Sequence, residues 1–223
     1  QAVSASGLDL HPENTTEAIL DGRFHRHFLE EETLFDNWAL EVNPEKIDVR
    51  QMNESLTAPE MRYITTILGN IDGKTLLDIG CGLGEAGIYF ATKGARVTAV
   101  DLSHEMLSKV KELAAFNHVS VETQQAMAEQ LHFPTDRKFD IIYAGNVFHH
   151  VDIRSALSEA VNHLEPGGKL VCWEPVAYNP VINIYRKVAN KVRSDDERPI
   201  TLSDIDIFKE FFSDVKIEWF WLT

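Results

Sequence analysis

Apolar positions along the chain follow two different rhythms, which divide it into an N-terminal part and a longer C-terminal part. Over residues 15–40, apart from a break near Gly22, and again over 58–68, apolar side chains recur every three or four positions. Both segments are therefore predicted to be helices. The polar segment 42–57 between them is predicted to be a loop, either a lid over a binding site or a plain connection.

From Gly73 onward, short β-rich runs alternate with runs of helical spacing, the pattern of a parallel sheet with crossover helices. We expect an α/β fold with a doubly wound, mostly parallel sheet, flanked by helices and preceded by an N-terminal helical lid. Residues 1–72 would form the helices and lid, and 73–223 the catalytic domain, in one structural unit. Strands are expected at 75–79, 96–100, 120–123, 140–144 and 169–173, a last extended run at 215–221, and helices at 85–92, 104–115, 153–163 and 181–192.

Composition narrows the possible partners more than it identifies a function. The chain of 223 residues has 44% apolar and 25% charged residues, which is typical of a soluble globular protein. Its net charge of −14 argues against a nucleic acid partner, because like charges repel at the distances over which steering acts. The short basic stretch 186–193 is interpreted as the solvated face of a helix.

Cysteine content and hydropathy favour a cytoplasmic protein. Cys81 and Cys172 lie in apolar or glycine-rich surroundings, without the spacing of a disulfide framework or a zinc site. No apolar run reaches the roughly 20 residues that span a bilayer, so no membrane span is expected. The pair His25 and His27 is not expected to bind metal, since alternate positions of a helix point in different directions, and no metal site is predicted.

A glycine-rich turn after the first predicted strand carries the strongest chemical signal. The strand 75–79 runs directly into Gly80, Gly82 and Gly84 and then into a helix. This order lets a ligand approach the backbone and the first amides of the helix. Asp101 follows at the end of the next strand, where a carboxylate can accept both hydroxyls of a ribose. The alternative is that Asp101 only caps the following helix.

Two cofactor classes remain open for this turn. The G-x-G-x-x-G fingerprint of dinucleotide-binding proteins is also satisfied over residues 82–87, with Asp101 at roughly the expected distance. Asp78 and Glu85, on either side of the glycines, would attract an amine and repel a pyrophosphate. A nucleoside with a positive charge is therefore favoured over NAD.

Five segments in sequence order resemble those of class I (Rossmann-like) S-adenosylmethionine-dependent methyltransferases that act on small molecules. Together they cover roughly residues 73–174, and the ordered set is far more specific than one glycine motif. The segments are the turn Leu77-Asp-Ile-Gly-Cys-Gly-Leu-Gly84, the strand end Val100-Asp-Leu-Ser103, the run Gln125 to Pro134, the strand and loop Phe139 to His150, and the turn Leu164-Glu-Pro-Gly-Gly-Lys-Leu170.

The resemblance implies S-adenosylmethionine as cofactor, S-adenosylhomocysteine as product, and a role for each matching position. Asp101 would hold the ribose, and Asn146 would lie near the methionine moiety. Met106 and Met127 would contact the nucleoside, with the alternative that they belong only to the core. The full set of implied cofactor-binding residues is Asp78, Gly80, Cys81, Gly82, Gly84, Asp101, Leu102, Met106, Met127, Ala128, Glu129 and Asn146.

Four further residues are candidates for contact with the methyl acceptor. Methyl transfer from a sulfonium mainly requires alignment and exclusion of water, and a base is useful when the acceptor is a hydroxyl. His149 and His150 follow the fourth strand at the ligand-binding edge, so an imidazole there can take a proton. The alternative is that they cap a helix or fill the core. Glu174 and Tyr178, at the equivalent edge after the fifth strand, are candidate substrate contacts.

The sequence favours transfer of a methyl group to a small-molecule acceptor whose reacting atom it does not name. An NAD-dependent oxidoreductase and a non-catalytic S-adenosylmethionine-binding protein are the alternatives. The region after Glu174 resembles the family least, because one aromatic-rich strand, 217–221, takes the place of the usual antiparallel pair. The natural chain is therefore expected to continue beyond Thr223. The sequence does not indicate an oligomeric state.

Overall fold

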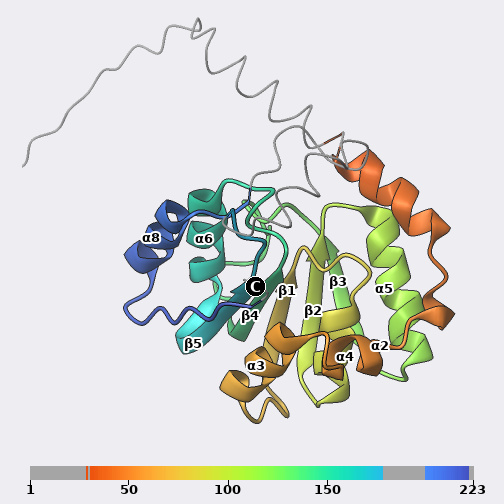
Figure 1. The fold of residues 1–223 in the computed structure, drawn as a ribbon. Coiled ribbons are helices and arrows are strands. Elements are labelled where there is room, and N and C mark those ends of the chain that lie inside the picture. Colours follow the sequence, from red (N-terminus) through yellow and green to blue (C-terminus); the bar gives the residue numbers. More distant parts are fainter. Residues whose placement is uncertain (1–28, 30, 178–198, 221–223) are drawn as a thin grey trace, which may run out of the picture.

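Five parallel strands form the centre of the molecule. The computed structural model describes residue 29 and residues 31–177 and 199–220. The order across the sheet is β3-β2-β1-β4-β5, and every neighbouring pair is parallel (Figure 1). The predicted doubly wound α/β fold is thus confirmed, and all strands end at one edge. The strands are β1 (Thr75–Ile79), β2 (Arg96–Asp101), β3 (Val121–Gln125), β4 (Phe139–Gly145) and β5 (Leu164–Trp173).

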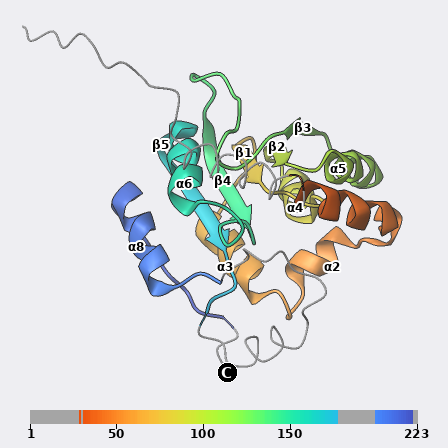
Figure 2. The same ribbon diagram turned by 90° about the horizontal axis from the view of Figure 1, so that it is seen from above.

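Helices cover both faces of this sheet, because successive residues of a strand point to opposite sides. These helices are α3 (Pro59–Leu68), α4 (Glu85–Thr92), α5 (His104–Phe116), α6 (Ile153–Asn162) and α8 (Leu202–Phe211). Leu76 in β1 and Ile141 in β4 belong to the core beneath α3, α4 and α5, whereas Leu77 and Ile142 belong to the core beneath α6 and α8. Figures 1 and 2 show helices on both sides of the strands.

The polar segment before α3, predicted to be a loop, contains a helix instead. This helix, α2 (Val49–Glu54), begins after Asp48, whose Oδ1 accepts the backbone N–H of Gln51 at 2.8 Å. Asn53 is buried and donates from Nδ2 to the carbonyl of Glu85 at 3.3 Å. A helix of six residues is too short to show an apolar period. The loop prediction was therefore wrong here, because the tertiary contacts that stabilise this helix cannot be read from the sequence.

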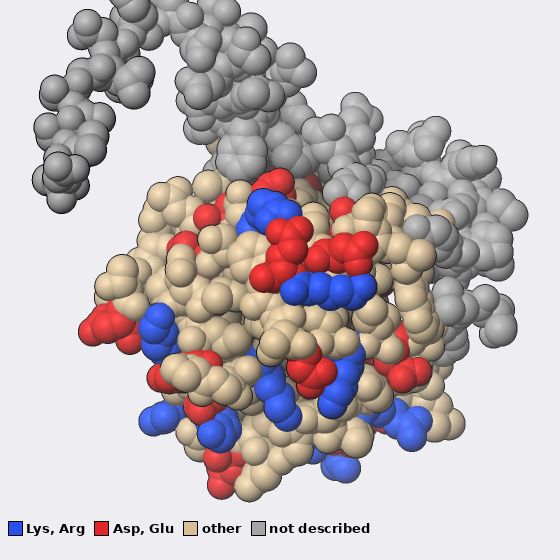
Figure 3. Space-filling view, turned by 90° about the vertical axis from the view of Figure 1, so that its left-hand side faces the viewer, with Lys and Arg blue, Asp and Glu red and all other residues tan. Residues whose placement is uncertain are grey.

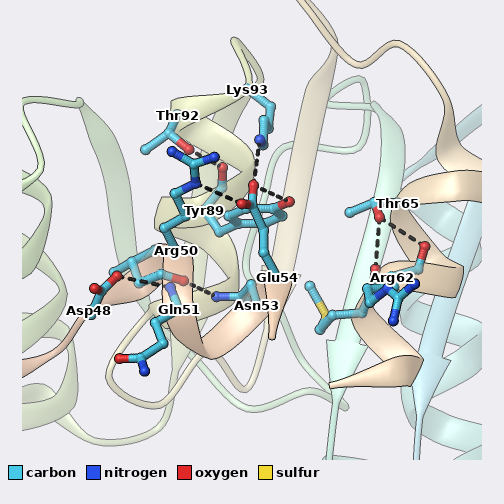
Figure 4. Close-up of polar contacts among 12 residues, drawn as sticks. Asp48, Arg50, Gln51, Asn53, Glu54, Arg62, Thr65, Tyr89, Thr92 and Lys93 are labelled. Carbon is cyan, nitrogen blue, oxygen red and sulfur yellow. Dashed lines mark hydrogen bonds and ion pairs between the residues drawn. The ribbon is translucent and has the colours of Figure 1, made fainter. Parts of the chain in front are cut away.

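A cluster of charged and polar groups fastens α2 to α4 (Figure 4). The Glu54 carboxylate accepts a hydrogen bond from Nε of Arg50 (2.7 Å) within α2. It also accepts bonds from Nζ of Lys93 (2.8 Å) and Oη of Tyr89 (3.2 Å), at and near the end of α4. The hydrogen bonds from Lys93 and then Arg50 lower the pKa of Glu54 to about 2. As a result, α2 lies along α4, with Asn53 against the start of that helix.

A further helix, over residues 31–41, and the 3-10 helix η1 (Pro44–Lys46) precede α2. Ala39 is fully buried and packs in a small cluster with Leu83 and Met106. The N-terminal helix predicted from residue 15 is therefore present in its described part. The remainder of that prediction lies outside the described residues.

Two C-terminal features differ from expectation. The strand β5 begins at Leu164, five residues before its predicted start at 169, and its pairing with β4 shifts register between Phe139 and Ile141. Residues 214–220 form no strand, so that prediction was wrong in the described part. Phe220 instead packs against the ring of Tyr63, with centroids 5.9 Å apart. The predicted helix 181–192 lies outside the described residues, and none of the described helices is long and apolar enough to cross a membrane.

Candidate functional site

A cavity of about 780 Å³ lies at the edge where the five strands end. Residues at or just after the carboxyl end of every strand line it, which is where open α/β sheets bind ligands. The helix over 31–41, the segment α2–α3 and the start of α4 complete its wall. The lining residues from the strand ends are Asp78, Gly80, Cys81, Gly82, Leu83, Asp101, Leu102, Ala126, Met127, Ala128, Glu129, Tyr143, Gly145, Asn146, Val147, His149, His150, Val151, Trp173 and Pro175.

The glycine turn after β1 brings the backbone to the cavity. Gly80 has a φ of +62°, and a Cβ there would lie 2.5 Å from Cγ2 of Val147, so the two turns approach this closely only because the residue is glycine. Gly82 (φ +53°) has no atom within 4 Å of the position of a Cβ, which leaves its backbone open to a ligand. Gly84, a predicted cofactor contact, does not line the cavity. A Cβ there would lie 2.8 Å from Val110, so it serves the packing of α4 on α5.

Asp78, near the end of β1, is a buried carboxyl group in the cavity wall. Its Oδ2 has no hydrogen-bond partner among the described residues and lies 2.6 Å from where a Cβ of Gly87 would be. Burial raises the pKa of Asp78 well above its usual value, Asp101 and Glu85 raise it further, and the backbone N–H of Gly87 opposes them. A cationic group beside Oδ2 would satisfy this oxygen and reduce the repulsion.

Asp101, at the end of β2, fastens the glycine turn to the start of α5. Its Oδ2 accepts the backbone N–H of Gly82 (2.8 Å), and its Oδ1 accepts that of Ser103 (2.9 Å). Burial raises the pKa of Asp101, and these backbone donors oppose the rise. The cap of α5 is Ser103, whose Oγ accepts the N–H of Met106 (3.0 Å), so Asp101 is not that cap. Each Asp101 oxygen keeps a lone pair for a ligand hydroxyl.

Of the remaining predicted cofactor positions, Met106 lies in the core and the others line the cavity. Met106 does not line the cavity, because its side chain is fully buried with Ala39 and Leu83, as the core alternative expected. Asn146 has a left-handed φ of +59°, which is uncommon outside glycine, and its N–H donates to the carbonyl of Trp173 at 2.9 Å. The positions that do line the cavity are Cys81, Leu102, Met127, Ala128, Glu129 and Asn146.

Glu174 organises the turn that follows β4. Its Oε1 accepts the backbone N–H groups of Val147 and Phe148, both at 2.8 Å, and its Oε2 lies 2.7 Å from Nδ1 of His149. In this contact the carboxylate accepts, so Nδ1 carries a hydrogen. His149 lines the cavity and Glu174 does not, so Glu174 acts through the turn and the imidazole rather than at the cavity surface. Tyr178, the other predicted substrate contact, lies outside the described residues.

His150 connects the site to the helix over residues 31–41. Its Nδ1 lies 3.1 Å from Oε1 of Glu31, and its ring packs edge-on against Phe35, with centroids 6.2 Å apart. In the same helix, Oδ1 of Asp36 accepts hydrogen bonds from Oγ of Ser103 and from the N–H of Glu105 (3.3 Å). Glu31 and Phe35 line the cavity, so this helix is part of its wall. Its opening and closing as a lid stays a prediction.

Other lining residues were given no function by the sequence. From the N-terminal part these are Glu31, Phe35, Trp38, Met52, Asn53, Thr57, Ala58, Glu60 and Met61. One signal was available, since Met52 is a lone large apolar residue in a polar segment. Tyr143 and Trp173 lie within two residues of the ends of β4 and β5, a position that marks both as candidates.

The described residues offer little support for metal or thiol chemistry. None of their His, Cys, Asp and Glu side chains form a group of three or more that could hold a metal ion. Burial raises the pKa of the Cys81 and Cys172 thiols, so both are protonated at neutral pH and are poor nucleophiles.

Comparison with known proteins identifies one type of domain. A family model described as a methyltransferase domain matches residues 77–172. The ubiquinone biosynthesis O-methyltransferase of Aeromonas salmonicida is 30% identical over 151 residues, which cover 64% of this chain and 63% of that protein. Phosphoethanolamine N-methyltransferase 1 of Arabidopsis thaliana is 30% identical over 148 residues, which cover 64% of this chain and 28% of that protein. The chain thus spans less than two thirds of the length of either relative.

Solved structures share the fold. A protein of Bacillus halodurans assigned as a methyltransferase is 27% identical, with a TM-score of 0.57 and 67% of each chain covered. The magnesium protoporphyrin IX methyltransferase of Synechocystis, solved with bound S-adenosylhomocysteine, is 18% identical, with a TM-score of 0.57 over 73% of this chain and 74% of that one. At 18% identity, the similarity to the Synechocystis enzyme shows a shared fold and no more.

Proposed function

We propose that residues 77–172, which match a family model described as a methyltransferase domain, form a class I, S-adenosylmethionine-dependent methyltransferase domain, and that the protein methylates a small-molecule acceptor. The observation that carries the proposal is the buried, unpartnered Oδ2 of Asp78 beside the open backbone of Gly82. A counter-charge and a close backbone approach are what the ammonium group and the nucleoside of this donor require.

The residues at the strand ends fit S-adenosylmethionine. Asp78 would face its ammonium group, Asp101 its ribose hydroxyls, and the segment 127–129 its adenine. When bound, the cofactor supplies a methyl group that is already activated on a sulfonium. The protein therefore has to align the acceptor and exclude water, and the helix over 31–41 contributes the wall that excludes it.

The last glycine of the G-x-G-x-x-G pattern over 82–87 has a structural reason that does not involve a dinucleotide. The missing Cβ of Gly87 makes room for the carboxyl group of Asp78. Burial raises the pKa of Glu85, which begins α4 and lines the cavity. A pyrophosphate at this helix start would bring negative charge beside two carboxyl groups that already resist ionisation. This supports a cationic nucleoside over NAD.

We assign the role of general base to His149. Its Nδ1 lies 2.7 Å from Oε2 of Glu174, and His149 lines the cavity, where an imidazole can exchange a proton with an acceptor hydroxyl or ammonium group. Glu174 stabilises the imidazolium that results, as the acidic partner of a histidine base does in other enzymes. His150 is the second candidate, because its Nδ1 lies 3.1 Å from Oε1 of Glu31 and it also lines the cavity.

Calorimetric titration with S-adenosylmethionine, S-adenosylhomocysteine and NAD tests the cofactor. We expect both sulfur compounds to bind, and binding of NAD alone would contradict the proposal. Release of S-adenosylhomocysteine across a panel of phenols, thiols, amines and lipids then tests catalysis. Cofactor binding without release over the whole panel would favour a non-catalytic binding protein.

A further inference from the structure

The order of strands divides the cavity into two sides, on either side of β1. The residues that fit the cofactor follow β1, β2 and β3. The other side, which we call the acceptor side, follows β4 and β5 and faces α2 and α3. Its apolar and aromatic members include Met52, Ala58, Met61, Tyr143, Trp173 and Pro175, and polar residues line the same side, namely Asn53, Thr57, Glu60, Asn146, His149 and His150.

The aromatic residues of the acceptor side satisfy their polar atoms among themselves. Nε1 of Trp173 donates to Oη of Tyr143 at 2.9 Å, and that hydroxyl lies 3.5 Å from Sδ of Met61. A Cβ on Gly145 would lie 2.5 Å from the same hydroxyl, so this glycine leaves space for the pair. With these polar atoms engaged, the rings present apolar surface to a ligand. Met52 extends this surface to the rim, where its side chain is 50% exposed.

The charge of the cavity has one sign. Six carboxyl groups line it, and no Lys or Arg of the described residues does; the six are Glu31, Glu60, Asp78, Glu85, Asp101 and Glu129. Burial raises the pKa of four of them, Asp78, Glu85, Asp101 and Glu129, which shows that negative charge is already disfavoured here. An anionic ligand would add like charge at short range in a partly buried site.

We propose that the methyl acceptor carries no anionic group and has an apolar or aromatic body that lies on the acceptor side, between α2–α3 and the ends of β4 and β5. This inference rests on the proposed function and names its substrate class. It separates the chain from one relative, since phosphoethanolamine is a phosphate ester, and a phosphate would find no cationic side chain among the described lining residues. An uncharged phenol or an apolar amine fits both the rings and the charge.

Three phenols that differ only in the charge of their tail test the proposal: 4-ethylphenol, tyramine and 3-(4-hydroxyphenyl)propionate. Binding is measured by calorimetry on the protein saturated with S-adenosylhomocysteine, and turnover by release of that product from S-adenosylmethionine. We expect the neutral and cationic phenols to bind about tenfold or more tightly than the anionic one. Equal or tighter binding of the anionic phenol, or no binding of any of the three, would overturn the proposal. Failure of the protein to bind S-adenosylhomocysteine would instead contradict the proposed function.

A matched pair of variants separates the cavity from the overall charge of the protein. Met52 and Leu56 belong to the same surface segment, but only Met52 lines the cavity, and Leu56 is 83% exposed. We expect Met52→Lys to improve the relative binding of the anionic phenol several-fold, and Leu56→Lys, with the same change of net charge, to leave the ranking as it was. Equal effects of the two substitutions would show that selectivity does not arise at the acceptor side.

Discussion

The pKa of Asp78 is raised because its carboxyl group is buried near two other acidic residues, and one of its oxygens has no partner among the described residues. Without a ligand, this group therefore holds its proton to a higher pH than an ordinary aspartate does. A cation beside Oδ2 has the opposite effect, because it favours the ionised form. Ligand binding and proton release are thus linked at this residue.

We expect S-adenosylmethionine binding to release protons and to become tighter as the pH rises through the raised pKa of Asp78. Calorimetry at one pH in two buffers with different ionisation enthalpies counts the protons released. Asp78→Asn should remove most of the release and weaken binding by roughly 1–3 kcal/mol, because a charge-assisted contact is lost. Unchanged proton release in this variant would mean that another carboxyl group is responsible.

Glu174 is the second residue whose charge can be tested. Glu174→Gln keeps the size of the side chain but removes the negative charge beside His149. We expect kcat to fall about tenfold or more with cofactor affinity unchanged, because the imidazole loses the carboxylate that faces its Nδ1. Glu165→Gln, exposed near the other end of β5, is the control. Equal kcat values for the two variants would show that the negative charge beside His149 plays no part in the reaction.

Helices and strands with a repeating apolar pattern were predicted from the sequence, whereas those fixed by contacts with distant residues were not. β1 was predicted with its observed ends and α4 likewise, because apolar runs and helical spacing are local. The helices α2 and α8 were not predicted, because the formation of a short or polar helix depends on its caps and its packing. The N-cap of α8 could have been predicted from Thr201 and Asp204, because the N–H of Thr201 donates to Asp204 at 2.8 Å.

The same distinction explains which parts of the site were predictable. The strand-end residues from Asp78 to Asn146 follow from the ordered motifs and from the rule that parallel strands end at one edge. Met106 and Gly84 lie in the expected motifs but do not reach the cavity. The side chain of Met106 is buried in the core, and Gly84 lies close against Val110 of α5. The acceptor side was not predictable, because the return of α2 and α3 over this edge is set by contacts between residues far apart in the chain.

The contact between α2 and α4 gives a prediction on stability. The pKa of Glu54 is lowered to about 2, so its stabilising effect is present above the ordinary glutamate range and is lost as the pH falls from about 4.5 to about 2. We expect Glu54→Gln to lower the Tm at pH 7 by a small amount, since the group is near the surface, and the difference from wild type to vanish near pH 2. Glu41→Gln, an exposed change of equal charge, is the control. A difference that persists at pH 2 would exclude the ion pairs as its cause.

The net charge of the chain and the charges on one face of the molecule give different pictures. The chain has a net charge of −14, yet the face in Figure 3 carries Lys and Arg interspersed with Asp and Glu rather than one broad field. The cavity, with its six carboxyl groups and no Lys or Arg among the described lining residues, is a local concentration of acidic groups. Such a concentration attracts a cation over about a Debye length, which is ~10 Å at 0.1 M salt.

We therefore expect the affinity for S-adenosylmethionine to fall more steeply with salt than that for S-adenosylhomocysteine. The two differ by the positive charge of the sulfonium, so the second compound is a built-in control for non-electrostatic effects of salt. Titrations between low and high sodium chloride measure both slopes. Parallel slopes would show that the cavity carboxyl groups exert no net field on the ligand.

The family match covers residues 77–172, and part of the cavity wall lies outside it. All residues that fit the cofactor lie inside this range, whereas Met52, Ala58, Met61, Trp173 and Pro175 lie outside it. Tyr143 and the turn after β4, with His149, lie within it. If the proposed function holds, exchange of residues 49–68 for the equivalent segment of a relative should change the choice of acceptor and leave binding of the methyl donor in place.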